Sequence, residues 1–395
     1  MILKNISILY GNDLRLIEST NVKILQQKFQ KINPQITSSN EKTLNCKGLL
    51  LIPGLINSHT HIGDSVGKDI SLNSSVDSKI HPVLGVKQKI LSETPKKELI
   101  RFMRRSAISM LKKGITTFVD FREGGIDGIQ LLKQALRGLP IRSIILGRIE
   151  YYQTKNEIKK NIPMPELYQS ELKSLLRNCD GIGISGANEN SNANMKTYSK
   201  TKKLRAIHAA ETVESYLASK KITGRSEPKR AMLTNPTFLV HMTFASKNDL
   251  REVSKKIRGI VVCPRANGAL AEGIPDIELM EKNNCNLAIG TDNVMINSPN
   301  LFREMDYLWK VSMGLNKKRI DPKKILKMTT VNAGNILNKK IGSIKEGFLA
   351  DCVFLEKASI DLEPLSNPHA AIVHRASENS IKAVMIGGEF VHGKI

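Results

Sequence analysis

Short apolar runs alternate with longer, helix-like segments from about residue 54 to residue 341. This alternation is expected of parallel strands joined by crossover helices. Eight apolar runs can be counted, at Leu55–His61, Thr116–Phe121, Ile141–Ile149, Gly181–Gly186, Leu204–Ala209, Thr237–His241, Gly259–Cys263 and Asn286–Thr291. The pattern predicts an α/β fold, a (β/α)₈ TIM barrel, whose active site lies at the C-terminal ends of the strands.

The two ends of the chain have a different pattern, with short β-like runs separated by polar and glycine-containing turns. We therefore expect a small β-sandwich domain assembled from residues 1–53 and 342–395, beside a catalytic barrel at 54–341. Within the barrel, Thr94 and Asp321, each followed by proline, are expected to begin helices. The polar stretches 62–93 and 187–203 are predicted to be long loops over the catalytic face.

Composition excludes several classes of protein. With 41% hydrophobic and 25% charged residues, the 395-residue chain resembles ordinary globular proteins. The opening stretch is too short and polar for a secretory signal, and no apolar run approaches the roughly 20 residues that span a bilayer. Five cysteines without a C-x-x-C pair favour reduced thiols. We expect a cytoplasmic protein without a membrane partner.

The net charge of +23 is the unusual global feature. Basic residues are spread over many segments, and aromatic residues, at 5%, offer few stacking platforms for bases. We expect no specific nucleic-acid partner. Attraction of a small anionic substrate by the long-range field remains open.

Side chains that can bind metal stand at the ends of the predicted strands. His59 and His61 are two residues apart, so the period of a strand directs both imidazoles to the same side. His208, His241 and Asp292 follow three other runs. One H-x-H pair could consist of ordinary polar residues. Here, however, four strands end in such side chains, and the ends of barrel strands lie on one rim. This arrangement favours a metal site.

Several segments resemble the successive motifs of the amidohydrolase superfamily, and more narrowly its cytosine deaminase-like and chlorohydrolase-like (ATZ/TRZ-type) branch. The similarity covers nearly the whole chain. The segments that carry it are Pro53–His61, His208–Glu211, His241, Cys263–Asn267, Gly290–Asn293, Asn332–Leu337 and Gly342–Asp351.

The resemblance implies a divalent metal, with Zn²⁺ preferred and Fe²⁺ or Mn²⁺ as alternatives. Its ligands would be His59, His61, His208 and Asp292. His241 would lie beside the metal and hold water or a substrate atom. Family members with two metals usually have a bridging modified lysine at the end of the fourth strand. The run at 181–187 contains no lysine, which favours a single metal.

The resemblance also implies a reaction. Glu211 would act as general acid and base, and Asp292 would accept a proton from water. Because a glutamate at the position of Glu211 accompanies deaminases and dechlorinases, we expect hydrolytic deamination of an amino-substituted purine, pyrimidine, nucleoside or related ring. Such an enzyme hydrolyses carbon–nitrogen bonds other than peptide bonds. Alternatively, Glu211 could have only a structural role, as an acidic residue at the start of the following helix, where it interacts favourably with the helix dipole.

Other polar residues after predicted strands are candidates for substrate contacts, although each could instead fix a loop. They are Arg148, Asn188, Glu189, Arg265 and Asn267. Arg122 and Glu123 could pair with each other. Two further functions stay open: hydrolysis of a C–Cl or another C–N bond, and a non-catalytic binding protein that retains the fold. The resemblance suggests a homo-oligomer with a small-molecule substrate.

Overall fold

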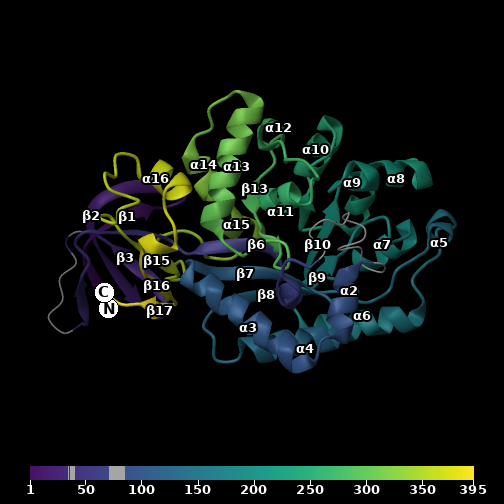
Figure 1. Ribbon diagram of the computed structural model, residues 1–395, viewed down its shortest axis with the longest axis horizontal. Coiled ribbons are helices and arrows are strands. Elements are labelled where there is room, and N and C mark those ends of the chain that lie inside the picture. Colours follow the sequence, from purple (N-terminus) through teal and green to yellow (C-terminus); the bar gives the residue numbers. More distant parts are fainter. Residues whose placement is uncertain (34, 36–40, 71–84) are drawn as a thin grey trace.

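The computed structural model describes residues 1–33, 35, 41–70 and 85–395. A mixed sheet that contains both chain ends lies beside a larger parallel sheet with helices around it (Figure 1). Within the described part of the chain, no helix is both long and apolar enough to cross a membrane.

The larger sheet has nine parallel strands in sequential order, and the last one pairs with the first, so that the sheet closes on itself. These strands are β6 (Leu55–His61), β7 (Ile115–Arg122), β8 (Arg142–Gly147), β9 (Gly181–Ile184), β10 (Leu204–Ala209), β11 (Phe238–His241), β12 (Gly259–Val262), β13 (Leu287–Ile289) and β14 (Asp292–Asn293). Side chains such as Val119, Phe238 and Val261 fill the interior. Each of the eight predicted runs contains a strand, and the TIM-like barrel is confirmed.

The helices lie mainly around the barrel, and one near the C-terminus lies beside the mixed sheet (Figure 1). They are η1 (Ile62–Gly67), α2 (Val86–Glu93), α3 (Lys96–Lys112), α4 (Gly125–Leu136), α5 (Lys155–Lys159), α6 (Glu166–Asn178), α7 (Asn192–Tyr198), α8 (Val213–Thr223), α9 (Glu227–Ala231), η2 (Met232–Thr234), α10 (Lys247–Ser254), α11 (Pro264–Ala269), α12 (Ile277–Lys282), α13 (Leu301–Asn316), α14 (Pro322–Met328), α15 (Val331–Leu337), α16 (Pro368–His374) and η3 (Glu378–Ser380). Asp321 caps α14 as predicted, since its side chain accepts from the Lys323 amide. The prediction for Thr94 was wrong, because its amide donates to Ile90 and Thr94 ends α2.

The two predicted loops contain more regular structure than expected. The stretch 62–93 begins with η1 and ends with α2, while its residues 71–84 lie outside the described part of the chain. The stretch 187–203 contains α7, which Ser191 caps by accepting a hydrogen bond from the Asn194 amide. Short helices rich in Asn and Ser have little apolar periodicity, which explains why the sequence pattern indicated loops.

The second sheet is built from both ends of the chain, as predicted. Its strands are β1 (Ile2–Tyr10), β2 (Arg15–Leu25), β3 (Lys28–Ile32), β4 (Thr43–Asn45), β5 (Leu49–Pro53), β15 (Cys352–Glu356), β16 (Ile381–Ile386) and β17 (Glu389–Gly393). They form one mixed sheet in the order β17-β16-β15-β5-β1-β2-β3, with β4 paired to β1. Its own core includes Leu3, Ile8 and Phe354. Arg142 of the barrel binds Asp351 of this part, with Nε 2.6 Å from Oδ2.

Candidate active site

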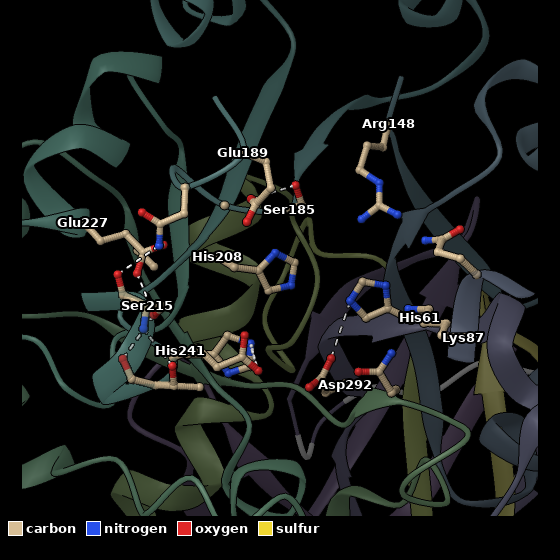
Figure 2. A pocket seen from close by; sticks show the side chains of 17 residues that line it. His61, Lys87, Arg148, Ser185, Glu189, His208, Ser215, Glu227, His241 and Asp292 are labelled. Atoms are coloured by element: carbon tan, nitrogen blue, oxygen red, sulfur yellow. Dashed lines mark hydrogen bonds and ion pairs between the residues drawn. The ribbon is translucent and has the colours of Figure 1, made fainter. Parts of the chain in front are cut away.

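Three histidines and one aspartate meet at the C-terminal ends of the barrel strands. The Nε2 atom of His59 lies 3.1 Å from Oδ1 of Asp292 and 3.2 Å from Nε2 of His208. Nε2 of His61 lies 3.5 Å from the same Asp292 oxygen. Figure 2 shows His61, His208 and Asp292 directed toward one another. The structure therefore brings together all four side chains that the sequence predicted as ligands.

The hydrogen bonds around this cluster suit a cation at its centre. Nδ1 of His208 donates to the Ile184 carbonyl at 3.0 Å, so its Nε2 carries a lone pair and no proton. Nδ1 of His61 in the same way donates to Glu123 at 2.7 Å. Oδ2 of Asp292 is buried without a hydrogen-bond partner. Lone pairs that converge in this way are the donor set of a metal site, and the residues fit a divalent ion.

Burial favours the neutral form of the His59 and His208 imidazoles, as metal binding requires. Burial lowers the pKa of His59 to about 3, although Asp292 opposes this shift. Burial and the neighbouring histidines lower the pKa of His208 well below its ordinary value. His241 and Asp292 also have positive φ angles, +68° and +59°. Non-glycine residues with positive φ are uncommon and concentrate at functional sites.

Glu211 stands beside the cluster, at the start of the segment that leads into α8. Its Oε1 lies 3.4 Å from Nε2 of His241, and both side chains line the same cavity. Burial and the carboxylates of Asp292 and Glu227 raise the pKa of Glu211 well above its ordinary value. A carboxyl group with such a raised pKa can hold a proton near neutral pH and deliver it, as a general acid must.

A cavity that is open to solvent leads to these residues, and its enclosed volume is about 130 Å³. Three of the five predicted substrate-contacting residues line it: Arg148, Asn188 and Glu189. Figure 2 shows Arg148 across the cavity from Glu227. Burial and the nearby Glu227 raise the pKa of Glu189 to about 7.

The other two predicted substrate contacts lie outside this cavity. Arg265 donates through Nη1 to Glu304 at 3.2 Å and to the Ser298 carbonyl at 3.3 Å. Asn267 is buried and donates to Glu272 at 3.2 Å. These side chains fix the loops after β12 and β14, so the structure does not bring them to the cavity.

Sequence reasoning missed several cavity residues, most of which come from helices rather than from strand ends. Lys87 and Gln88 of α2, Ser185 after β9, Ser215 of α8 and Glu227 of α9 all line the cavity. Because Ser226 has the pattern of a helix cap, Glu227 could be predicted in the first turn of a helix. No local signal placed that helix at the active site.

Glu123 contacts both His61 of the histidine cluster and two basic side chains, Arg122 and Lys87. Arg122 pairs with it, as the sequence suggested, with Nη2 2.8 Å from Oε2. Glu123 also accepts from His61 and lies 2.5 Å from Nζ of Lys87. Burial raises the pKa of Glu123, but Lys87, His61 and Arg122 together lower it well below its ordinary value. Glu123 is therefore an ionised acceptor that orients His61.

Comparison with known proteins agrees with this geometry. The model of the amidohydrolase family matches residues 50–391. The chain belongs to the amidohydrolase family. The predicted superfamily is therefore confirmed. Its members are metal-dependent hydrolases, which agrees with the histidine cluster described above.

Among relatives of this amidohydrolase, a protein of Methanothermobacter thermautotrophicus, provisionally named an aminohydrolase, is 35% identical over 399 residues, 99% of each chain. A 5-methylthioadenosine/S-adenosylhomocysteine deaminase of Thermococcus sibiricus is 25% identical and covers 99% of this chain and 93% of its own. The fold is similar to that of zinc-bound atrazine chlorohydrolase TrzN from Arthrobacter aurescens, with a TM-score of 0.85, 15% identity, and 99% of this chain and 95% of that chain covered.

Proposed function

We propose that this amidohydrolase is a hydrolytic deaminase of an amino-substituted nitrogen heterocycle and releases ammonia. The proposal rests mainly on Glu211. Its carboxyl group has a raised pKa, and its side chain lines the same cavity as His61, His208 and Asp292 of the cluster. A hydrolase that attacks an amidine carbon needs a proton for the ring nitrogen and another for the leaving amine. Glu211 is placed to supply both.

The proposed metal ligands are His59, His61, His208 and Asp292. A divalent ion held there would polarise a water molecule and lower its pKa toward 7. Asp292 has an unpartnered Oδ2 atom, which can accept the proton that the water loses on attack. His241, whose ring nitrogens make no hydrogen bond and whose Nε2 lies 3.4 Å from Glu211, can orient that water or the ring. Glu211 would protonate the ring nitrogen as the new C–O bond forms, regain a proton from the hydroxyl group of the adduct and pass it to the amine. The C–N bond then breaks, ammonia leaves with a carbonyl product behind it, and the proton on Asp292 restores Glu211.

The cavity walls suggest what the substrate carries besides the ring. Among the described residues, Nε of Arg148 and Oδ1 of Asn188 are buried without a hydrogen-bond partner. An anionic group would satisfy the guanidinium, and a hydroxyl or amine would satisfy the amide oxygen. Relatives named 5-methylthioadenosine/S-adenosylhomocysteine deaminase make purine nucleosides with a substituted ribose the first compounds to test.

The test is ammonia release by the zinc-loaded protein from a panel of purines, pyrimidines, nucleosides, pterins and aminotriazines. We expect release from at least one aminated ring, and none from a matched ring without the amino group. Chloride release from a chlorotriazine, without ammonia release from any aminated ring, would favour a chlorohydrolase. No reaction from protein with full zinc occupancy would count against deamination.

A further inference from the structure

Helix α2 is held against the barrel by a charged side chain. Lys87 is 3% exposed and is the only buried residue among the eight of α2, all of which the structure describes. Its Nζ lies 2.5 Å from Oε1 of Glu123 and 3.5 Å from Oδ2 of Asp64. A buried ammonium group is costly without such partners. The position of α2 therefore depends on the carboxylates beneath it as well as on the packing of Leu91 against the core.

The carboxylate oxygen that binds Lys87 also binds His61. Oε1 of Glu123 accepts from Nδ1 of His61 at 2.7 Å, which leaves Nε2 of His61 directed toward Asp292. The other oxygen of Glu123 is bound by Arg122 at 2.8 Å. Lys87 and His61 thus share one acceptor atom. Removal of the ammonium group would change both the position and the charge environment of the atom that orients His61.

We propose that Lys87 is a positioning residue that couples the docking of α2 to metal binding by His61, with Glu123 as the shared link. The inference rests on the proposed metal-dependent function. Because Lys87 and Gln88 also line the cavity, the coupling joins one cavity wall to the metal site. Coupling between two binding events is reciprocal. Bound zinc should therefore stabilise docked α2 by the same factor by which docked α2 strengthens zinc binding.

The first experiment compares Lys87→Met with Lys89→Met, a matched variant of an exposed lysine on the same helix. Zinc affinity is measured by competition with a chelator, and amide hydrogen exchange of residues 86–93 is measured with and without zinc. In the wild type and Lys89→Met, zinc should slow exchange across α2. In Lys87→Met, we expect zinc affinity to fall by about tenfold, as for other outer partners of metal ligands, and the zinc-dependent slowing to disappear.

A second comparison tests whether Lys87 acts through Glu123. Glu123→Gln preserves the shape of the side chain and can still accept from His61, but it removes the charge that Lys87 needs. If the link is Glu123, adding Lys87→Met to Glu123→Gln should weaken zinc binding little further, because effects that share one partner are not additive. The nitrogen NMR signals of His61 would report its tautomer in each variant.

Equal zinc affinity in Lys87→Met and Lys89→Met, together with the same effect of zinc on α2 exchange, would overturn the coupling. Neither readout needs turnover. A protein that binds zinc but releases no ammonia would therefore contradict the proposed deaminase and leave the test of Lys87 intact. A wild-type protein that binds no zinc would contradict both.

Discussion

Glu211 is the single residue on which the proposed chemistry depends most directly. In Glu211→Gln, we expect the zinc content and the melting temperature to stay near those of the wild type, because Glu211 lies outside the proposed ligand set. Turnover should fall by about 10²–10⁴-fold, since the amide cannot transfer the proton. Ammonia-release kinetics, metal analysis and thermal unfolding check these three expectations. Glu214→Gln, an exposed neighbour on α8, is the control. Full activity in Glu211→Gln would refute the role.

Asp292 should respond differently, because it is proposed both to bind the metal and to accept a proton. Its Oδ1 contacts His59 and His61 at 3.1 and 3.5 Å, so Asp292→Asn removes the negative charge at the centre of the cluster. We expect zinc affinity to fall at least as far as the 10–100-fold typical of outer partners, and turnover to fall with it. Chelator competition measures the first effect. Wild-type zinc affinity in Asp292→Asn would remove Asp292 from the ligand set.

The difference between predicted and missed residues has a physical cause. His59, His61, His208 and Asp292 end apolar runs, and the ends of parallel barrel strands must meet, so a local pattern implied a distant contact. Lys87 and other residues of the cavity wall stand on helices whose position depends on tertiary packing. The stretch that contains α2 was predicted to be a loop, and even where a helix was predicted, the sequence did not show where that helix lies in the fold.

At the scale of elements, the strands were predicted well because a strand buried on both faces is a short apolar run bounded by polar residues. The short helices were harder to predict. α7 is held by hydrogen bonds such as that from Nε of the buried Arg230 to Asn192 at 3.1 Å, together with the buried side chains of Met195 and Tyr198, which are too few to show a helical period in the sequence. Polar residues that follow strands were also ambiguous. The same pattern predicted substrate contacts for Arg148 and Arg265, but only Arg148 lines the cavity.

The role of Arg265 can be tested directly. It joins α11 to α13 through Glu304, whose side chain is fully buried. Burial raises the pKa of Glu304 to about 8, and Arg265 opposes the shift. In Arg265→Ala, Glu304 loses the guanidinium and keeps the hydrogen bond from the amide of residue 265, and we expect a loss of about 2 kcal/mol in the free energy of unfolding. KM should not change, because Arg265 does not line the cavity. Denaturant unfolding and steady-state kinetics check both statements.

The control for this variant is Arg303→Ala, an exposed arginine on α13 beside Glu304. It should leave both stability and KM near the wild-type values. If Arg265→Ala instead raised KM several-fold without loss of stability, Arg265 would regain the substrate-binding role that the sequence suggested.

At the scale of the whole molecule, two sequence patterns predicted the architecture. β-like runs at both ends of the chain implied one composite sheet, and the eight internal runs implied the barrel. The order of the strands within the composite sheet was not predictable, because β5 pairs with β15 across some 300 residues and no local signal records that partner. The contact of Arg142 with Asp351 is likewise visible only in the folded molecule.

Zinc binding should stabilise the whole barrel, because the proposed ligands come from β6, β10 and β14, which are far apart along the chain. A ligand that binds only the folded state adds about 2.7 kcal/mol at 100 times its Kd. We expect chelation to lower the melting temperature by a few degrees, and added zinc to restore it. Magnesium, which prefers oxygen ligands, should not restore it, since three of the four proposed ligands are imidazoles. Asp292→Asn should lose most of the zinc-dependent shift. A melting temperature that does not respond to zinc in the wild type would show that the cluster does not bind the metal in the folded protein.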